Sequence, residues 1–158
     1  MKKKKILKIG KFKSIEKSSE IFIGEWCVDN YLNLSSDNFF DDKSYSKKNI
    51  LNSHKKFLLY FDDLEDYVIK KLNYIHNKKY PKRYWRILLG NWLNWYIKII
   101  INRFYIIKKI INLNEFNSIE FSLKRQTQLC SQGTSDINLL CDDPNWNSKL
   151  YLNLCNYL

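Results

Sequence analysis

The chain has 158 residues, of which 45% are hydrophobic, and its formal net charge at pH 7 is +11. This length can bury the core of one domain, and the apolar fraction is ordinary for a globular protein. Four scattered cysteines without a C-x-x-C pair, and only two histidines, argue against a disulfide framework and a metal site. Such thiols are typical of the reducing cytoplasm, where we expect the protein.

The positive charge is unevenly distributed along the chain. Residues 1–17 contain eight lysines and one glutamate, and residues 67–114 contain eleven basic residues and no acidic residue. Alanine is absent while lysine, asparagine and isoleucine are abundant, so part of the charge reflects A- and T-rich codons. We interpret residues 1–17 as a basic, disordered tail, since lysines interrupt any signal-peptide core. The alternative is contact with a membrane surface through Lys2, Lys3, Lys4 and Lys5.

The first predicted element is a short buried strand at residues 20–23, which Gly24 breaks. Polar residues dominate 29–52, where the apolar pair at 39–40 indicates a second short strand. A helix is predicted from about residue 53 to residue 77, because six apolar residues recur at helical spacing on one face. They are Phe57, Phe61, Leu64, Val68, Leu72 and Ile75.

Pro81 separates this helix from a second one, predicted for residues 82–111. Most of its circumference is apolar, which predicts a long buried central helix against which the preceding helix folds back. A membrane span is disfavoured because Lys98 and Arg103 would lie near the bilayer centre. Association with a membrane interface stays open for this segment.

The last third of the chain has weaker patterns. Residues 115–123 include a predicted strand, residues 124–144 are expected to form a loop, and a terminal helix carries Leu150, Leu154 and Leu158 on one side. The order of elements predicts an α/β fold. More specifically, we expect a helix-rich, incomplete Rossmann-like N-terminal domain over residues 18–158.

Gly24, Glu25 and Trp26 follow the first predicted strand. Ligands bind at the carboxyl ends of strands in open α/β sheets, where a glycine permits close approach and a carboxylate can act as a base. This position makes Glu25 a candidate catalytic residue and its two neighbours candidate substrate contacts. The alternative is a turn in which Glu25 pairs with a cation.

Arg83 and Arg86 lie three residues apart at the start of the second helix, so they share a side and could grip a phosphate. Cations at a helix N-terminus need a negative counterpart, because that end is already electropositive. The alternative to a bound anion is a buried pair with Glu25 or an aspartate. His76 is a candidate acid or base, or a hydrogen-bonded loop histidine.

Two further groups are weaker candidates. Asp41 and Asp42 could bind a metal or a hydroxyl but fit a solvated turn better. The tryptophans of the second helix could stack on a sugar or base ring, yet their helical spacing favours the core. The standard catalytic motifs are absent, so the sequence predicts neither a metal nor a cofactor.

Several segments resemble, in order, a family of transferases encoded in bacterial O-antigen and surface-polysaccharide regions. The resemblance is carried by Ile21–Cys27, Phe40–Lys43, His76, Arg83–Leu93, Arg103 and Asn145–Asn147. It implies an α/β transferase related to nucleotide-sugar glycosyltransferases, with a nucleotide-sugar or a phosphorylated lipid-linked substrate. Members of that family continue beyond residue 158, so the resemblance implies an N-terminal portion that is not active alone. Asn91 stands where the family usually has proline.

Two functions without catalysis are the alternatives. A basic, aromatic-rich chain could bind nucleic acid, but its aromatic residues lie at core spacing, so nucleic acid is the less favoured partner. A peripheral membrane or complex-assembly module is the other, which would place the protein at the inner face of the membrane.

Overall fold

The computed structural model describes residues 5–13, 19–29, 34–40, 47–124, 128–131 and 133–158. The chain divides into two compact units, one formed by residues 1–42 and 102–158 and the other by residues 43–101. Each unit is described by itself, and the single domain expected over residues 18–158 stays a prediction.

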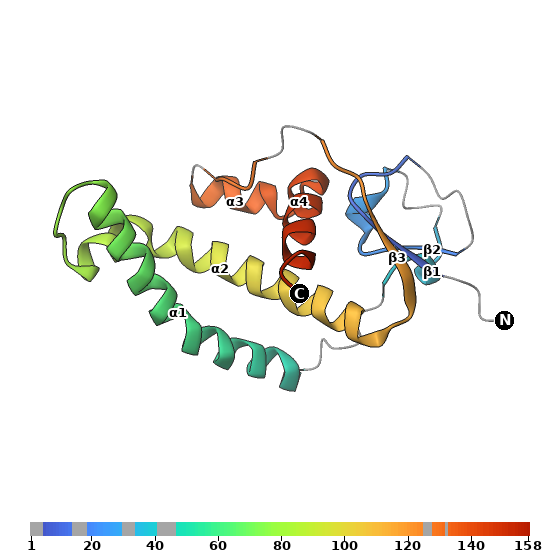
Figure 1. Cartoon of the computed structure of the whole chain (residues 1–158), viewed down its shortest axis with the longest axis horizontal. Helices are drawn as coiled ribbons and strands as arrows, with labels where there is room; N and C mark the ends of the chain where they lie inside the picture. Colours follow the sequence, from blue (N-terminus) through green and yellow to red (C-terminus); the bar gives the residue numbers. More distant parts are fainter. Residues whose placement is uncertain (1–4, 14–18, 30–33, 41–46, 125–127, 132) are drawn as a thin grey trace. The chain divides into compact units, whose positions relative to one another are not determined.

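The first unit contains a parallel sheet of three strands, β1 (Lys5–Ile9), β2 (Glu20–Phe22) and β3 (Phe116–Phe121) (Figure 1). Their order is β2-β1-β3, so β1 is central. The strands predicted at 20–23 and 115–123 are confirmed. At the predicted second strand, Phe39 forms an isolated bridge with Phe22. The chain is an α/β protein.

The disordered tail expected at residues 1–17 is wrong for residues 5–9, which form the central strand. Leu7 and Ile9 are fully buried and pack with Ile107, Ile110 and Tyr151. Lys8 points to the other face, where its Nζ lies 2.9 Å from Glu20 Oε1. The neighbouring strand thus supplies the carboxylate that lets a lysine be buried. Lys2, Lys3 and Lys4 lie outside the described residues, and Lys5 pairs with Glu115 at 3.8 Å.

Two helices follow β3, α3 (Thr134–Leu140) and α4 (Pro144–Cys155). The terminal helix is confirmed, whereas α3 lies where a loop was expected. Asp143 caps α4, because its side chain accepts a 2.6 Å hydrogen bond from the backbone N–H of Trp146. Pro144 at the first helical position needs no such bond. Residues Glu25–Cys27 and Ser36–Asn38 form single turns of 3₁₀ helix.

The second unit is a helical hairpin of α1 (Lys47–Ile75) and the first part of α2 (Lys82–Leu113). Phe57, Leu93 and Ile97 form its core, with Phe61 and Val68 packed against them. The folding back of the first helix on the second is confirmed. The predicted apolar face of the first helix is confirmed in part, since Leu64 and Ile75 are exposed. α1 begins six residues earlier than predicted, at Lys47.

The turn between the two helices is fixed by backbone and side-chain hydrogen bonds. α1 ends in a Schellman motif, in which Lys78 N–H donates to the Asn73 carbonyl at 2.9 Å and Asn77 has a φ of 49°. The Asn73 side chain then exchanges two 3.0 Å hydrogen bonds with the backbone of Tyr80. It also accepts one from Trp85 Nε1 at 2.9 Å.

The burial expected for α2 is wrong over its first turns, although its length is confirmed. Ile87 is 74% exposed and Trp95 is 47% exposed. Among the described residues of the second unit, those that pack on this part of α2 belong to α1, and a single helix covers one side of its neighbour. In the part of the chain that the structure describes, no helix has both the length and the apolar content of a membrane span.

Candidate functional site

The end of the central strand is a crowded junction within the first unit. The Ile9 carbonyl accepts hydrogen bonds from Ser122 N–H, just after β3, at 2.9 Å and from Ser148 Oγ in α4 at 3.0 Å. Gly10 follows with a φ of +117°, and a Cβ there would lie only 2.4 Å from the Ser122 carbonyl oxygen. Only glycine fits this position, where β1, β3 and the first turns of α4 converge.

The same edge of the sheet includes the segment that follows β2, with Gly24, Glu25 and Trp26. The backbone at Gly24 is extended, so its requirement is steric: a Cβ would lie 2.6 Å from Trp26 Nε1. Glu25 is exposed at the start of the 3₁₀ turn. Phe12 N–H donates to the Cys27 carbonyl at 2.8 Å, which joins the segment after β1 to the segment after β2. The two strand ends therefore lie side by side.

Cys27 is buried beneath this edge, with its Sγ 3.8 Å from the Lys8 carbonyl oxygen. Burial raises the pKa of its thiol from 9.0 to about 11. Burial also raises the pKa of Cys141 and of Cys155, whereas Cys130 is exposed. The cysteine nearest the candidate site is thus a packing residue rather than a nucleophile.

Alkylation should distinguish these thiols. At neutral pH we expect iodoacetamide to modify Cys130 first and Cys27 last, because Cys27 is both buried and protonated. Mass spectrometry of peptides taken at successive times measures the order. Labelling of Cys27 should become fast only in urea. Equal rates for the two residues in the folded protein would contradict the burial of Cys27.

Arg103 and Asn147, which the sequence singled out only as parts of motifs, form a hydrogen-bond network. Arg103 Nε donates to Asn147 Oδ1 at 3.0 Å, and Arg103 Nη2 donates to the Cys141 carbonyl at 3.3 Å. Asn147 is fully buried, and its amide donates to the carbonyls of Cys141 and Asp143. The network holds the start of α4 against α2, and so positions Ser148 at the end of β1.

The cations at the start of α2 have their negative counterpart within the hairpin. Arg86 Nε lies 2.8 and 2.9 Å from the two carboxylate oxygens of Glu65, and Arg86 Nη2 lies 2.6 Å from Glu65 Oε2. Arg86 also contacts Asp62 at 3.0 Å. Lys82 Nζ lies 2.6 Å from Asp66 and 3.1 Å from Glu65. For Arg86 the structure therefore shows the alternative to a bound anion, a pairing with carboxylates, and the partners are Glu65 and Asp62 rather than Glu25.

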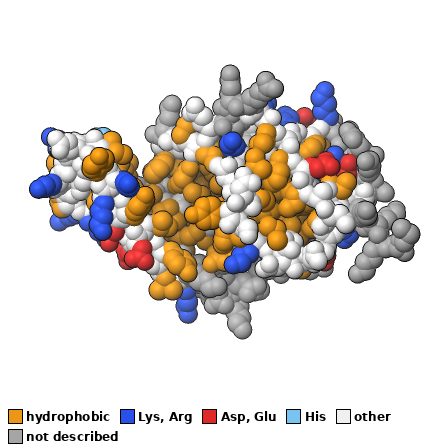
Figure 2. Space-filling view, in the orientation of Figure 1, with side chains coloured by type: hydrophobic (Ala, Val, Ile, Leu, Met, Phe, Trp, Pro, Cys, Tyr) orange, Lys and Arg blue, Asp and Glu red, His pale blue; other side chains and the backbone are white. Residues whose placement is uncertain are grey.

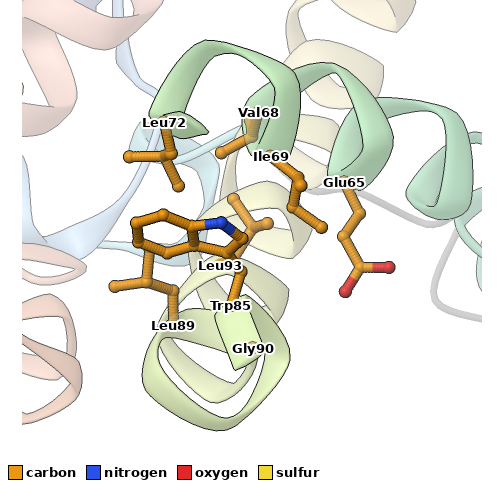
Figure 3. Close-up of a pocket in the computed structure, with 8 residues that line it drawn as sticks. All are labelled: Glu65, Val68, Ile69, Leu72, Trp85, Leu89, Gly90 and Leu93. Carbon is orange, nitrogen blue, oxygen red and sulfur yellow. The ribbon is translucent and has the colours of Figure 1, made fainter. Parts of the chain in front are cut away.

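Glu65 stands at the edge of an apolar contact between the two helices (Figure 3). The figure shows its carboxylate directed away from the Trp85 ring and from Leu72 and Leu89. The gap among these residues has a volume of about 10 Å³, which is no larger than one water molecule needs. This gap is a packing feature and not a substrate site.

The pKa of Glu65 lies below its usual value of 4.5, chiefly because Arg86 donates hydrogen bonds to it and secondarily because of Lys82. The ionised pair therefore contributes stability that is fully present above pH 4.5 and is lost as the pH falls through the folded pKa. In thermal melts at descending pH we expect Glu65→Gln to lose less stability below pH 4.5 than the parent chain. Asp63→Asn is the control, since Asp63 is exposed and forms no ion pair with a described residue. If the melting temperatures of Glu65→Gln and of the parent chain fell equally as the pH is lowered below 4.5, this linkage would be contradicted.

The predicted site residues fall in both units. Gly24, Glu25 and Trp26 belong to the first unit, and His76, Arg83 and Arg86 belong to the second. Their assembly into one cleft stays a prediction.

Other candidates have the following surroundings. The His76 ring is exposed, and its centroid lies 5.6 Å from that of Trp85. Arg83 is exposed and has no ion pair among the described residues. Asp41 and Asp42 lie outside them. Within the described ranges, no three His, Cys, Asp or Glu side chains gather as a metal site requires. The role of Gly10 was missed because its contacts come from positions more than a hundred residues away.

Comparison with known proteins supports the resemblance to a family of transferases. A family model described as LIC12162 family transferase matches residues 9–158. The match includes the carboxyl edge of the sheet, the helical hairpin and α4. No curated protein and no solved structure matches the chain.

Proposed function

The chain belongs to the LIC12162 family of transferases, and we propose that it binds the substrate of a glycosyl transfer in the biosynthesis of bacterial surface polysaccharide or O-antigen. The substrate class is a nucleotide-sugar or a phosphorylated, lipid-linked sugar acceptor. The observation that carries this proposal is the edge of the parallel sheet at which Gly10, Gly24 and Glu25 follow adjacent strands.

The strand order supports a ligand site at that edge. From β1 the chain passes to β2 on one side, and from β2 it passes to β3 on the other side of β1. In open, Rossmann-like sheets, ligands bind outside the carboxyl ends of the strands where the order reverses in this way. At this edge Gly24 is partly exposed and Glu25 is exposed, so they are the groups that a phosphate or a sugar could approach, whereas Gly10 is buried beside Ser122 and Ser148.

Glu25 is the candidate base at this edge. In the proposed reaction an acceptor hydroxyl loses its proton to the Glu25 carboxylate while its oxygen forms the bond to the anomeric carbon. The bond from that carbon to the phosphate oxygen breaks, and the nucleotide leaves with the electron pair. A carboxylate that is exposed in the free protein can also accept hydrogen bonds from sugar hydroxyls, so that it orients the acceptor as well as activating it.

The two arginines differ in how available they are to bind a phosphate. Arg86 is engaged by Glu65 and Asp62, whereas Arg83 is exposed one turn earlier. Arg83 is therefore the stronger candidate for a diphosphate, and His76 is the second candidate acid or base. We expect Arg83→Ala to weaken phosphate binding without loss of stability and Arg86→Ala to lower the stability of the hairpin.

The proposal is tested by adding a panel of uridine, guanosine and thymidine diphosphate sugars to isotopically labelled protein. We expect one of them to shift the backbone amide signals of Gly10, Gly24 and Glu25. Transfer from that donor to a hydroxyl of a lipid-linked sugar is then measured with a radiolabelled sugar, in a family member that continues beyond the matched region and carries the substitution at the position of Glu25. Glu25→Gln should lower the rate by about 10²–10⁴-fold, the usual contribution of a general base.

Glu115→Gln is the matched control, because Glu115 is also exposed and contacts Lys5 at the opposite end of the sheet. It should leave both the amide shifts and the transfer rate unchanged. The absence of any shift at the sheet edge with every donor and acceptor would overturn the proposal. Full activity of Glu25→Gln would overturn the role of that residue.

A further inference from the structure

The turn between α1 and α2 brings exposed apolar side chains together with positive charge. Tyr74 and Ile75, at the end of α1, are 84% and 70% exposed. Lys78 and Lys79 follow them in the turn, are also exposed, and line the same open hollow. In Figure 2, orange and blue side chains lie next to one another on the left-hand lobe, where Figure 1 places this turn. We call these four residues the hairpin tip.

The hairpin tip is held in this conformation by groups other than the four exposed side chains. Backbone hydrogen bonds of the Schellman motif close the end of α1, and the Asn73 side chain binds the backbone of Tyr80 and the indole of Trp85. Packing between the helices involves Phe57, Leu93 and Ile97 further along the hairpin. The tip side chains are therefore displayed at its end, and replacing them should not disturb the fold.

The charge around the hairpin tip has one sign. No acidic residue occurs between positions 67 and 114. The nearest carboxylates along α1, those of Glu65 and Asp66, are already engaged by Lys82 and Arg86. Lys70 and Lys71, one turn before the tip, add two more exposed cations. This cluster of lysines produces a positive local potential that attracts an extended anionic surface.

We propose that the hairpin tip docks on an anionic lipid surface. Tyr74 and Ile75 would lie at the level of the headgroups, and Lys78 and Lys79 would contact lipid phosphates. Tyrosine beside lysine suits the boundary between water and hydrocarbon, where an aromatic body is buried and a cation stays hydrated. This inference does not depend on the proposed transfer reaction.

Two other occupants fit the hairpin tip less well. A second copy of the chain would bring two groups of lysines face to face, and like charges across an interface oppose association. A nucleic acid would neutralise the lysines but would leave Ile75 without an apolar environment. A lipid surface satisfies both the charge and the apolar side chains.

Sedimentation of the whole chain with lipid vesicles tests the proposal. At low salt we expect binding to vesicles that contain phosphatidylglycerol and little binding to vesicles of phosphatidylcholine alone. The double variant Lys78→Gln/Lys79→Gln should lower the affinity about 25-fold, at roughly fivefold for each lysine. Tyr74→Ser/Ile75→Ser should lower it at least about tenfold, because apolar burial is lost. Circular dichroism and melting temperature should match the parent chain for both variants.

Matched controls distinguish this tip from other surfaces. Leu139→Ser and Tyr157→Ser remove apolar side chains that are 75% and 91% exposed in the other unit, and they should leave vesicle binding unchanged. The triple variant Lys2→Gln/Lys3→Gln/Lys4→Gln examines the lysines at the start of the chain. Loss of binding in this triple variant, with full binding by both tip variants, would overturn the proposal. A change of molecular mass in Tyr74→Ser/Ile75→Ser with unchanged vesicle binding would overturn it in favour of self-association.

Discussion

Replacement of Lys8 by methionine is expected to lower the free energy of unfolding by about 3–5 kcal/mol, the usual cost of removing one partner of a buried ion pair. Lys8 Nζ lies 2.9 Å from Glu20 Oε1, and the two side chains are only 6% and 3% exposed. Methionine preserves most of the apolar length of lysine but not its charge. The Glu20 carboxylate would then remain in the sheet without this cation. Urea denaturation followed by circular dichroism measures the loss.

Lys5→Met provides the control within the same strand. Lys5 Nζ lies 3.8 Å from Glu115 Oε2, and both side chains are about half exposed. Exposed ion pairs contribute about 0–1 kcal/mol, so this variant should stay close to the parent. If the two variants lost similar amounts of unfolding free energy, burial beside Glu20 would add nothing to the stabilising contribution of Lys8.

Gly10→Ala is expected to lower the free energy of unfolding by about 2–6 kcal/mol. A positive φ costs a residue with a Cβ about 1–3 kcal/mol, and the φ of Gly10 is +117°. The new methyl group would also lie 2.4 Å from the Ser122 carbonyl oxygen and 2.9 Å from Ser148 Oγ. Relief of that overlap requires a shift of β3 or α4 and costs about a further 1–3 kcal/mol. The same denaturation experiment measures the sum.

Gly90→Ala makes the same chemical change in an open position of α2. The nearest heavy atom to the added Cβ is Arg86 Cβ at 3.8 Å, which is an ordinary van der Waals contact. Because alanine is the better helix former, we expect a gain of roughly 0.5–1 kcal/mol. A Gly10→Ala protein as stable as the parent would contradict the crowding of the strand end by Ser122 and Ser148.

The elements predicted correctly are those whose evidence is local. The spacing of apolar residues in α1 and α2, and the proline between them, lie within short windows of sequence, and helices form from contacts within such windows. The same holds for β2, which lies in a short apolar run, and for β3, where apolar and polar residues alternate towards its end. α3 was missed because its few apolar residues sit in a polar segment too short to show a period.

The central strand was missed because its pattern is masked by lysines. A strand with Lys5 and Lys8 resembles a solvated tail until Glu20 and Glu115 are known to lie beside it. Those carboxylates come from β2 and from the segment just before β3, on either side of β1. The pairing of Lys5 with Glu115 spans more than a hundred residues, and neither it nor the pairing of Lys8 with Glu20 leaves a periodic signal in one sequence.

In the candidate site, too, some features could be predicted from local sequence and others depend on distant segments. Gly24, Glu25 and Trp26 are consecutive, so their position at the end of a strand could be predicted from that strand alone. Gly10 has no such local signal, because the atoms that exclude a Cβ belong to Ser122 and Ser148. The need of Arg86 for an anion was predicted from its place at a helix start. That Glu65 supplies this anion required the hairpin itself.

The amino-acid sequence by itself determined the helical hairpin, two of the three strands, the α/β class and the resemblance to a transferase family, since all of these depend on residues close together or on motifs in order. Only the tertiary structure decided that a lysine-rich segment is the central strand and that the cations of α2 pair with α1. It also decided that one side of α2 stays exposed. The physical reason is common to all three: charge pairing and burial depend on which distant segments become neighbours, and spacing along the chain does not encode that.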